Sequence, residues 1–142
     1  MAEELKEVKL IRQITDLLIR SDSAGDGHYG APRGNRTHCG IDYCCEPGSP
    51  ILSPVVGTVT KHGYPYGDDL SWRYIQITDH DGMHHRLFYV KPQAPIGVEV
   101  TASTQVGLAQ DIAIRYPGQG MTPHVHYEIM NDAGEYTNPM ST

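Results

Sequence analysis

The sequence predicts a mainly β protein of the α+β class, an antiparallel β-sheet domain preceded by one N-terminal amphipathic helix. Three observations predict this fold. Apolar residues recur at helical spacing only near the N-terminus, the pattern changes to period two from Pro50 onward, and 15 Gly and 10 Pro divide the 142 residues into short runs. A chain of this length fits a single domain. We expect a helix and connection over 1–24 and the β domain over 25–142.

The helix is predicted from Glu3 to Arg20. Its apolar stripe consists of Leu5, Val8, Ile11, Ile14 and Leu18. A helix of this kind packs on its own domain or docks on a partner, and its mixed charge makes a membrane surface the weaker choice of partner. The following segment, 21–36, is rich in Gly, Asp and Arg without a hydrophobic period, which predicts a surface loop.

Strands are expected wherever short period-two runs lie between Gly, Pro, Asn and Asp. The runs are 55–60, 74–78, 86–90, 98–101 and 124–130. Residues 79–82 and 131–134 have the composition of hairpin connections. The Tyr content, nine against one Phe and one Trp, suits the walls of a polar groove as well as a core.

The charge balance excludes some partners. The formal net charge is −6 and no Lys/Arg cluster is present, so we expect no binding to nucleic acid. No apolar run approaches the roughly 20 residues that span a bilayer. The N-terminus carries Glu3, Glu4 and Lys6 instead of a basic stretch before an apolar core, so we expect synthesis in the cytoplasm without a signal peptide. Nothing in the sequence indicates the oligomeric state.

The three cysteines, Cys39, Cys44 and Cys45, cannot form a complete set of disulfides. We interpret them as reduced residues that fill small spaces in the packing, since free Cys is among the most buried residue types. The alternative is thiolate ligation of a metal, although a Cys-x-x-Cys pair is absent.

Two histidine pairs indicate chemistry. His38 precedes Asp42 by four residues, and His124 and His126 flank one residue, which places both on one face of a strand, about 6.6 Å apart. Two imidazoles and one carboxylate form the ligand set of a hydrolytic zinc site that leaves its fourth position to water. If one histidine of the His-x-His pair binds the metal, the other lies beside the water and can transfer its proton.

The residues around both pairs resemble the lysostaphin/LytM-type zinc endopeptidases, which cut peptides of bacterial cell walls. The stretch 38–42, His-Cys-Gly-Ile-Asp, is similar to that family's His-x-Gly-x-Asp, and 47–59 is similar to the strand and turn that follow. Residues 122–128, Thr-Pro-His-Val-His-Tyr-Glu, resemble Gly-Pro-His-Leu-His-Phe-Glu, and 138–139 resemble a closing Asp-Pro. The resemblance extends from about Gly27 to Pro139.

This resemblance implies a function and a set of roles. One Zn²⁺ would be bound by His38, Asp42 and His126, with His124 as a catalytic histidine and Tyr29 as a residue that supports the oxyanion. The implied substrate is an amide in peptidoglycan peptides. Because no wall-binding module or signal peptide is evident, we expect a phage or prophage lysin that reaches the cell wall after lysis or on a phage particle.

One departure from the family pattern bears on activity. Family peptidases usually carry a second catalytic histidine in a Tyr-x-His-Leu stretch, and Lys91 stands at the matching position of Tyr-Val-Lys-Pro. Lysine can stabilise negative charge but is a poor base. His85 could replace the histidine only through a change of strand register. The same stretch is similar to leukocyte cell-derived chemotaxin-2, which has the fold and zinc site but is regarded as inactive, so the alternative function is a non-catalytic zinc-binding recognition domain.

Overall fold

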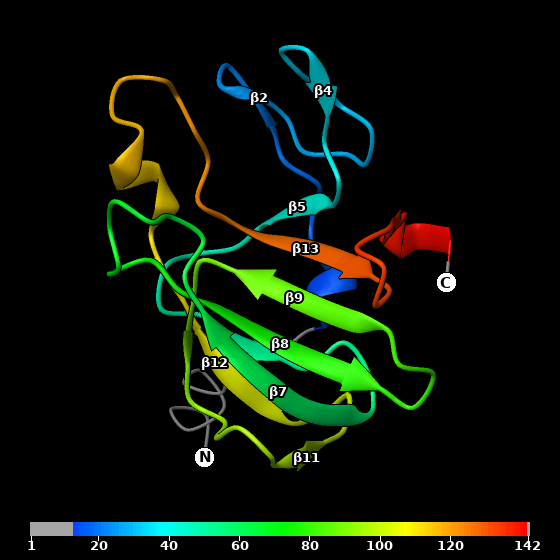
Figure 1. Cartoon of the computed structure of the whole chain (residues 1–142). Helices are drawn as coiled ribbons and strands as arrows, with labels where there is room; N and C mark the ends of the chain where they lie inside the picture. The colour runs from blue at the N-terminus through cyan, green and yellow to red at the C-terminus, as the bar shows by residue number, and fades with distance from the viewer. Residues whose placement is uncertain (1–12, 142) are drawn as a thin grey trace, which may run out of the picture.

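A computed structural model describes residues 13–141, which form two antiparallel sheets and two small hairpins (Figure 1). The larger sheet has seven strands in the order β11-β7-β8-β9-β13-β14, with β5 paired beside β13. Its strands are β5 (Ile41–Cys44), β7 (Gly57–Gly63), β8 (Tyr74–Asp79), β9 (His84–Phe88), β11 (Glu99–Val100), β13 (His124–Met130) and β14 (Tyr136–Thr137). The predicted mainly β, antiparallel fold is confirmed.

The smaller sheet has the order β10-β12-β6. Its strands are β6 (Pro50–Leu52), β10 (Val90–Pro92) and β12 (Gln105–Ala109). Three short 3₁₀ helices complete the described elements: η1 (Ile14–Asp16), η2 (Ile112–Arg115) and η3 (Pro139–Ser141). None of the helices in residues 13–141 is long and apolar enough to span a bilayer.

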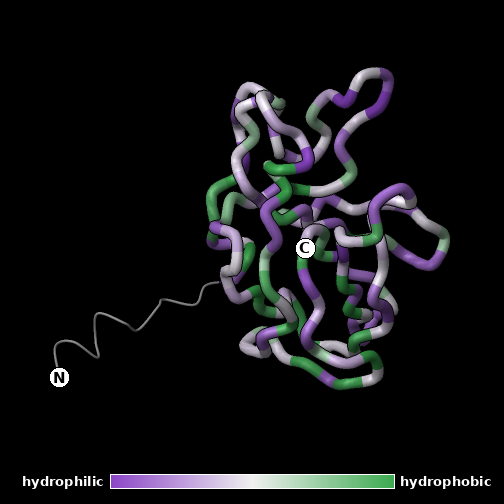
Figure 2. The backbone as a smooth tube through the Cα atoms, turned by 90° about the vertical axis from the view of Figure 1, so that its left-hand side faces the viewer, coloured by the Kyte–Doolittle hydropathy of each residue, from purple (hydrophilic) through white to green (hydrophobic). Residues whose placement is uncertain are grey.

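Two hairpins occupy the segment that the sequence predicts as a loop. They are β1 (Ser21–Asp22) with β2 (Gly25–Asp26), and β3 (Pro32–Arg33) with β4 (Arg36–Thr37). Both project from the larger sheet on the same side as the loop that leads into β13 (Figure 1). The projecting loops are mostly hydrophilic, whereas hydrophobic stretches lie in the body of the domain (Figure 2).

The predicted N-terminal helix is wrong in the part that is described. Residues 1–12 lie outside the described residues, and residues 13–20 contain only η1 followed by extended backbone. Ile14 belongs to the core with 1% of its surface exposed, and Ile19 forms a β-bridge with Tyr43. Strand pairing and burial of Ile14 have overridden the helical periodicity, which is a weak local preference.

The hydrophobic core lies between the two sheets. The larger sheet contributes Ile75, Ile77, Leu87, Val125 and Tyr127, among others, and the smaller sheet contributes Ile51, Val90, Val106 and Ala109. Alternation along each strand places these side chains on the inner face. The polar residues between them must therefore lie on the other face of the larger sheet.

Strand β13 is buried on both faces, which is unusual for a strand that alternates polar and apolar residues. Val125, Tyr127 and Ile129 enter the core, while His124, His126 and Glu128 lie on the other face and are also buried. Buried polar groups are stable only with partners. The outer face of β13 therefore carries a cluster of buried polar side chains, which makes it a candidate functional site.

Candidate metal centre

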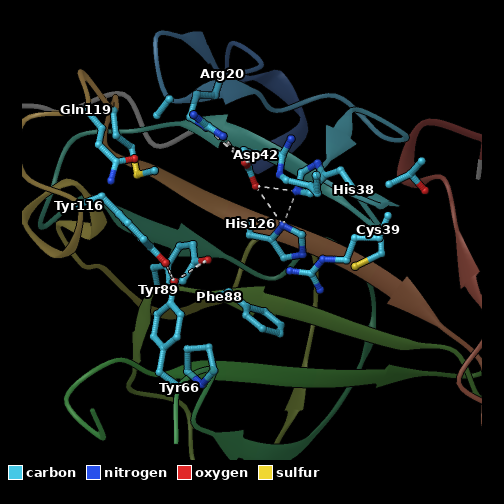
Figure 3. A pocket seen from close by; sticks show the side chains of 16 residues that line it. Arg20, His38, Cys39, Asp42, Tyr66, Phe88, Tyr89, Tyr116, Gln119 and His126 are labelled. Carbon is cyan, nitrogen blue, oxygen red and sulfur yellow. Dashed lines mark hydrogen bonds and ion pairs between the residues drawn. The ribbon is translucent and has the colours of Figure 1, made fainter. Parts of the chain in front are cut away.

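Strand pairing brings the two histidine motifs together, although more than 80 residues separate them in the chain. In the β5–β13 pair, His126 lies directly opposite Asp42. His38 lies three residues before β5, and its side chain points toward the same place (Figure 3). The register of one antiparallel pair thus assembles the predicted ligand set.

Three ligand atoms converge on one point. His38 Nε2 lies 3.0 Å from His126 Nδ1, and His126 Nδ1 lies 2.9 Å from Asp42 Oδ1. The third side, from His38 Nε2 to Asp42 Oδ1, is 3.2 Å. Zinc–ligand bonds of about 2.0–2.1 Å in tetrahedral geometry separate ligand atoms by roughly 3.3 Å. The three side chains therefore fit a zinc ion with little adjustment.

The remaining ring nitrogens are fixed by hydrogen bonds. His38 Nδ1–H donates to the carbonyl of His28 at 3.0 Å, and His126 Nε2–H donates to Glu128 Oε1 at 2.8 Å. Metal-binding histidines usually donate their second N–H in this way, because the bond sets the tautomer and the ring orientation. Gly40 makes room for this arrangement, since a Cβ there would meet Tyr127 O at 2.4 Å and His126 Cε1 at 2.8 Å.

The carboxylate of Asp42 is held by cations on its other oxygen. Arg20 Nη2 lies 3.2 Å from Oδ2, and Arg33 Nη2 lies 3.6 Å from it. Burial opposes the charge of Asp42, but hydrogen bonds from His126 and His38 outweigh burial and hold the pKa of Asp42 far below its ordinary value. In the metal-free protein Asp42 is therefore an anion ready to bind a cation.

His124 lies beside the three ligand atoms without being one of them. Its Nδ1–H donates to the carbonyl of Thr122 at 2.8 Å, and its Nε2 lies 3.6 Å from Asp42 Oδ2. Burial lowers the pKa of His124, and the charge of Asp42 only partly offsets this effect. The ring is therefore neutral near pH 7, with Nε2 free to accept a proton.

A pocket of about 490 Å³ opens over the ligand atoms. His38, Asp42 and His126 lie on one side, and three tyrosines form the opposite wall (Figure 3). Tyr66 and Tyr116 share a 2.7 Å hydrogen bond between their hydroxyl groups, and Tyr66 donates to Tyr89 at 3.4 Å. Burial raises the pKa of Tyr66 to about 12. Burial also raises the pKa of Tyr89, so the hydroxyl groups of Tyr66 and Tyr89 stay protonated at neutral pH.

Tyr89 has an unusual backbone. Its φ of 68° is the only positive φ of a non-glycine residue in the described chain. Such a conformation costs of order 1–3 kcal/mol and persists where the surroundings impose it. The backbone N–H of Tyr89 donates to Arg73 O at 2.8 Å, and its ring packs edge-on against His124 at 5.6 Å between centroids.

The other predicted catalytic residues lie elsewhere. Tyr29 packs, partly buried, against the hydrophobic core, and Lys91 is exposed on β10; neither lines the pocket. His85 faces the core side, where it contacts Tyr127 Oη at 2.6 Å. Phe88, at the end of β9, lies beside the ligand group and lines the pocket, and it was not predicted from the sequence.

The cysteines are free, as the sequence predicts. Cys39 lies in a second group of possible ligand atoms with His126 and Glu128, and its thiol is 3.6 Å from Glu128 Oε1. Because Glu128 already accepts the Nε2–H of His126, we interpret this group as support for the imidazole. Cys44 and Cys45 belong to neither group of ligand atoms among the described residues.

Comparison with known sequences identifies the family. The profile of Peptidase family M23 matches residues 36–139. The chain belongs to peptidase family M23. Leukocyte cell-derived chemotaxin-2 of Mus musculus is 30% identical over 107 residues, 75% of this chain and 69% of that protein. An uncharacterized metalloprotease of Haemophilus influenzae is 28% identical over 109 residues, but the match covers only 21% of its length.

Solved structures of M23 proteins have the same fold. A mutant catalytic domain of the prophage-encoded M23 protein EnpA from Enterococcus faecalis superposes with a TM-score of 0.63 and 25% identity, over 82% of this chain and 88% of that one. The catalytic domain of lysostaphin from Staphylococcus simulans gives a TM-score of 0.64 at 20% identity, over 90% and 92%. The resemblance to lysostaphin-type proteins is therefore confirmed for sequence family and fold.

Proposed function

We propose that this M23 domain is a zinc-dependent endopeptidase that hydrolyses amide bonds in peptidoglycan peptides. The observation that carries the proposal is the convergence of His38 Nε2, Asp42 Oδ1 and His126 Nδ1 within 3.2 Å of one another at the base of an open pocket. When bound, a zinc ion supplies a Lewis acid that acidifies water and polarises the carbonyl of an amide.

His124 is the residue that moves the proton in this proposal. Its Nδ1–H is held by Thr122 O, so only Nε2 is available, and that nitrogen faces the ligand group. A neutral imidazole can accept the proton of water and return it to the leaving amine. A positioned general base contributes about 10²–10⁴ in rate.

The tyrosine wall supports the developing negative charge. Tyr66, Tyr89 and Tyr116 line the wall opposite His126 (Figure 3). Tyr116 donates to Tyr66 and Tyr66 donates to Tyr89, so the hydroxyl hydrogen of Tyr89 remains for an oxyanion. Donors placed in a partly dehydrated site stabilise an oxyanion more strongly than water does. We assign the tyrosine wall this role in place of Tyr29 and Lys91, because Tyr29 packs against the hydrophobic core and Lys91 is exposed on β10.

A second candidate function is zinc-dependent recognition without catalysis. Phe88 favours it, because an apolar ring stands directly opposite His126 where a second imidazole could act. The 30% identity to leukocyte cell-derived chemotaxin-2 of Mus musculus is consistent with this alternative. In that case the pocket binds a peptide or glycan and the metal holds the fold.

The setting we propose for the enzyme is a phage or prophage lysin. The similarity to a prophage-encoded M23 protein supports this setting. The chain can be expressed inside a bacterium whose wall contains the proposed substrate, with and without a co-expressed holin. Lysis of the two cultures measures whether access to the wall limits hydrolysis. Lysis that depends on the holin supports the proposal, and intact cells in both cultures would count against it.

Purified, zinc-loaded protein incubated with peptidoglycan sacculi separates the two candidates. The enzyme proposal expects a steady release of new amino groups, and His124→Ala should lower the rate by about 10²–10⁴ while the zinc content is unchanged. Binding to sacculi without any release of amines would support recognition and overturn catalysis.

A further inference from the structure

The pocket has a charge opposite to that of the protein. The chain carries a net charge of −6, yet three arginines and only one carboxylate line the pocket. The arginines are Arg20, Arg33 and Arg36, and the carboxylate is Asp42. A bound zinc ion would add further positive charge. Clefts lined by one sign of charge concentrate ligands of the other sign.

The three arginines are not equivalent. Arg20 is buried and contacts both Asp22 and Asp42, and Arg33 contacts Asp42 at 3.6 Å. Those two residues therefore compensate the charge of Asp42. Arg36 is exposed, and its side chain has no hydrogen bond or ion pair within residues 13–141, so its guanidinium is free for a ligand.

Arg36 lies close to the metal centre. It stands two residues before His38 on the chain, at the end of the hairpin where it pairs with Arg33. Two residues of extended backbone span about 6.6 Å. An anion on the Arg36 side chain would thus lie one to three residues along an extended peptide from an amide held over His38 and His126.

We propose that Arg36 forms an anion subsite that binds a carboxylate of the substrate one to three residues from the scissile amide. The inference rests on the proposed function and narrows it to peptides that carry a free carboxylate near the cut. Arg is suited to this task because its planar guanidinium can donate two parallel hydrogen bonds to a carboxylate.

Sacculi free of teichoic acid test the subsite when half of the preparation has its carboxyl groups converted to carboxamides with ammonia and a carbodiimide. Binding is measured as the zinc-loaded protein that sediments with each preparation at low salt. General electrostatics predict the opposite of our proposal, since a protein of charge −6 should bind the amidated, less anionic sacculi better. The subsite predicts that the native sacculi bind about three- to tenfold better.

Two variants with the same change of charge make the test specific. Arg36→Gln should lose this preference, whereas Lys61→Gln, at an exposed position on β7 that does not line the pocket, should keep it. Equal binding of both preparations by the wild type, or equal loss in both variants, would overturn the subsite. Release of amines is scored separately. If both preparations are hydrolysed at equal rates, the peptidase proposal is supported and the subsite is overturned. If the native sacculi are bound selectively but not hydrolysed, the subsite is supported and the peptidase proposal is overturned.

Discussion

Phe88 lies directly opposite His126 in the β9–β13 pair, with its ring edge-on to the imidazole and 5.1 Å between the centroids. Phenylalanine can neither accept nor donate a proton, so the proton transfers that we propose are assigned to His124 alone. Lys91, by contrast, pairs with Leu108 in the smaller sheet. Phe88 lines the pocket and Lys91 does not, so we expect a substitution at 88, not at 91, to change the hydrolysis that we propose.

Phe88→His should increase hydrolysis. The new imidazole would lie across from His126 on the pocket side, where it could share the proton transfers with His124, and we expect the rate to rise by about ten- to a hundredfold. Lys91→His, on the exposed face of β10, is the matched control and should leave the rate unchanged. Amine release from sacculi measures both. A gain at position 91 without a gain at 88 would contradict the assignment.

Gly40→Ala should weaken metal binding. A Cβ at position 40 collides with Tyr127 O and with the ring of His126, and backbone atoms cannot move away cheaply. We expect a loss of about 1–3 kcal/mol in stability and a lower affinity for zinc. Calorimetric titration with zinc and thermal unfolding measure these effects.

Gly67→Ala controls for the loss of a glycine. No atom lies within 4 Å of a Cβ built at Gly67, and its backbone does not have the left-handed conformation. Its zinc affinity should match the wild type. If the two variants bind zinc equally well, the close packing at Gly40 does not position His126.

The candidate ligands could be named from the sequence because the residues around two short motifs resemble those of lysostaphin-type peptidases. His38 and Asp42 are four residues apart, and the alternation of β13 places His124 and His126 on one face. The pairing of His126 with Asp42 was not predictable from either motif, since only the register of β5 on β13 creates it. Local pattern identifies the strands, and tertiary structure decides which of them meet.

Two failures of the sequence reading have physical causes. Lys91 was placed at the site because Tyr-Val-Lys-Pro matches the family's Tyr-x-His-Leu, but the left-handed backbone of Tyr89 lies between β9 and β10, and Lys91 belongs to the smaller sheet. The helix expected up to Arg20 does not reach that residue, because residues 18–20 pair with β5 instead: Ile19 bridges Tyr43, and the backbone N–H of Arg20 donates to Asp42 O at 2.8 Å. The spacing of apolar residues carries no information about this pairing. For the tyrosines that line the pocket, the high Tyr content of the sequence was the signal that could have predicted them.

Asp79 should make stability depend on pH below about 4. Burial opposes its charge, but hydrogen bonds from His85 and from the backbone of Met83 and Asp81 outweigh burial and lower the pKa of Asp79 below 3.8. A lowered pKa in the folded state means that ionised Asp79 stabilises the fold above the unfolded pKa. This stabilisation is lost as the pH falls through the folded pKa.

Asp79→Asn tests this dependence by chemical unfolding at several pH values. We expect a loss of about 1–2 kcal/mol at pH 7 and a much smaller difference from the wild type near pH 2.5. Asp132→Asn is the matched control, because Asp132 also contacts a histidine of β9, His84 at 2.6 Å, but is 87% exposed. It should change stability little at either pH. A loss for Asp79→Asn that is equal at both pH values would point to packing instead of charge.

The zinc content of the purified protein tests the central claim most directly. After loading and extensive dialysis, elemental analysis should find one zinc per chain in the wild type and in His124→Ala, and none in His126→Ala or Asp42→Ala, because only the latter two lose a ligand atom. A wild-type chain that takes up no zinc, or a His126→Ala chain that retains it, would contradict the metal centre described above.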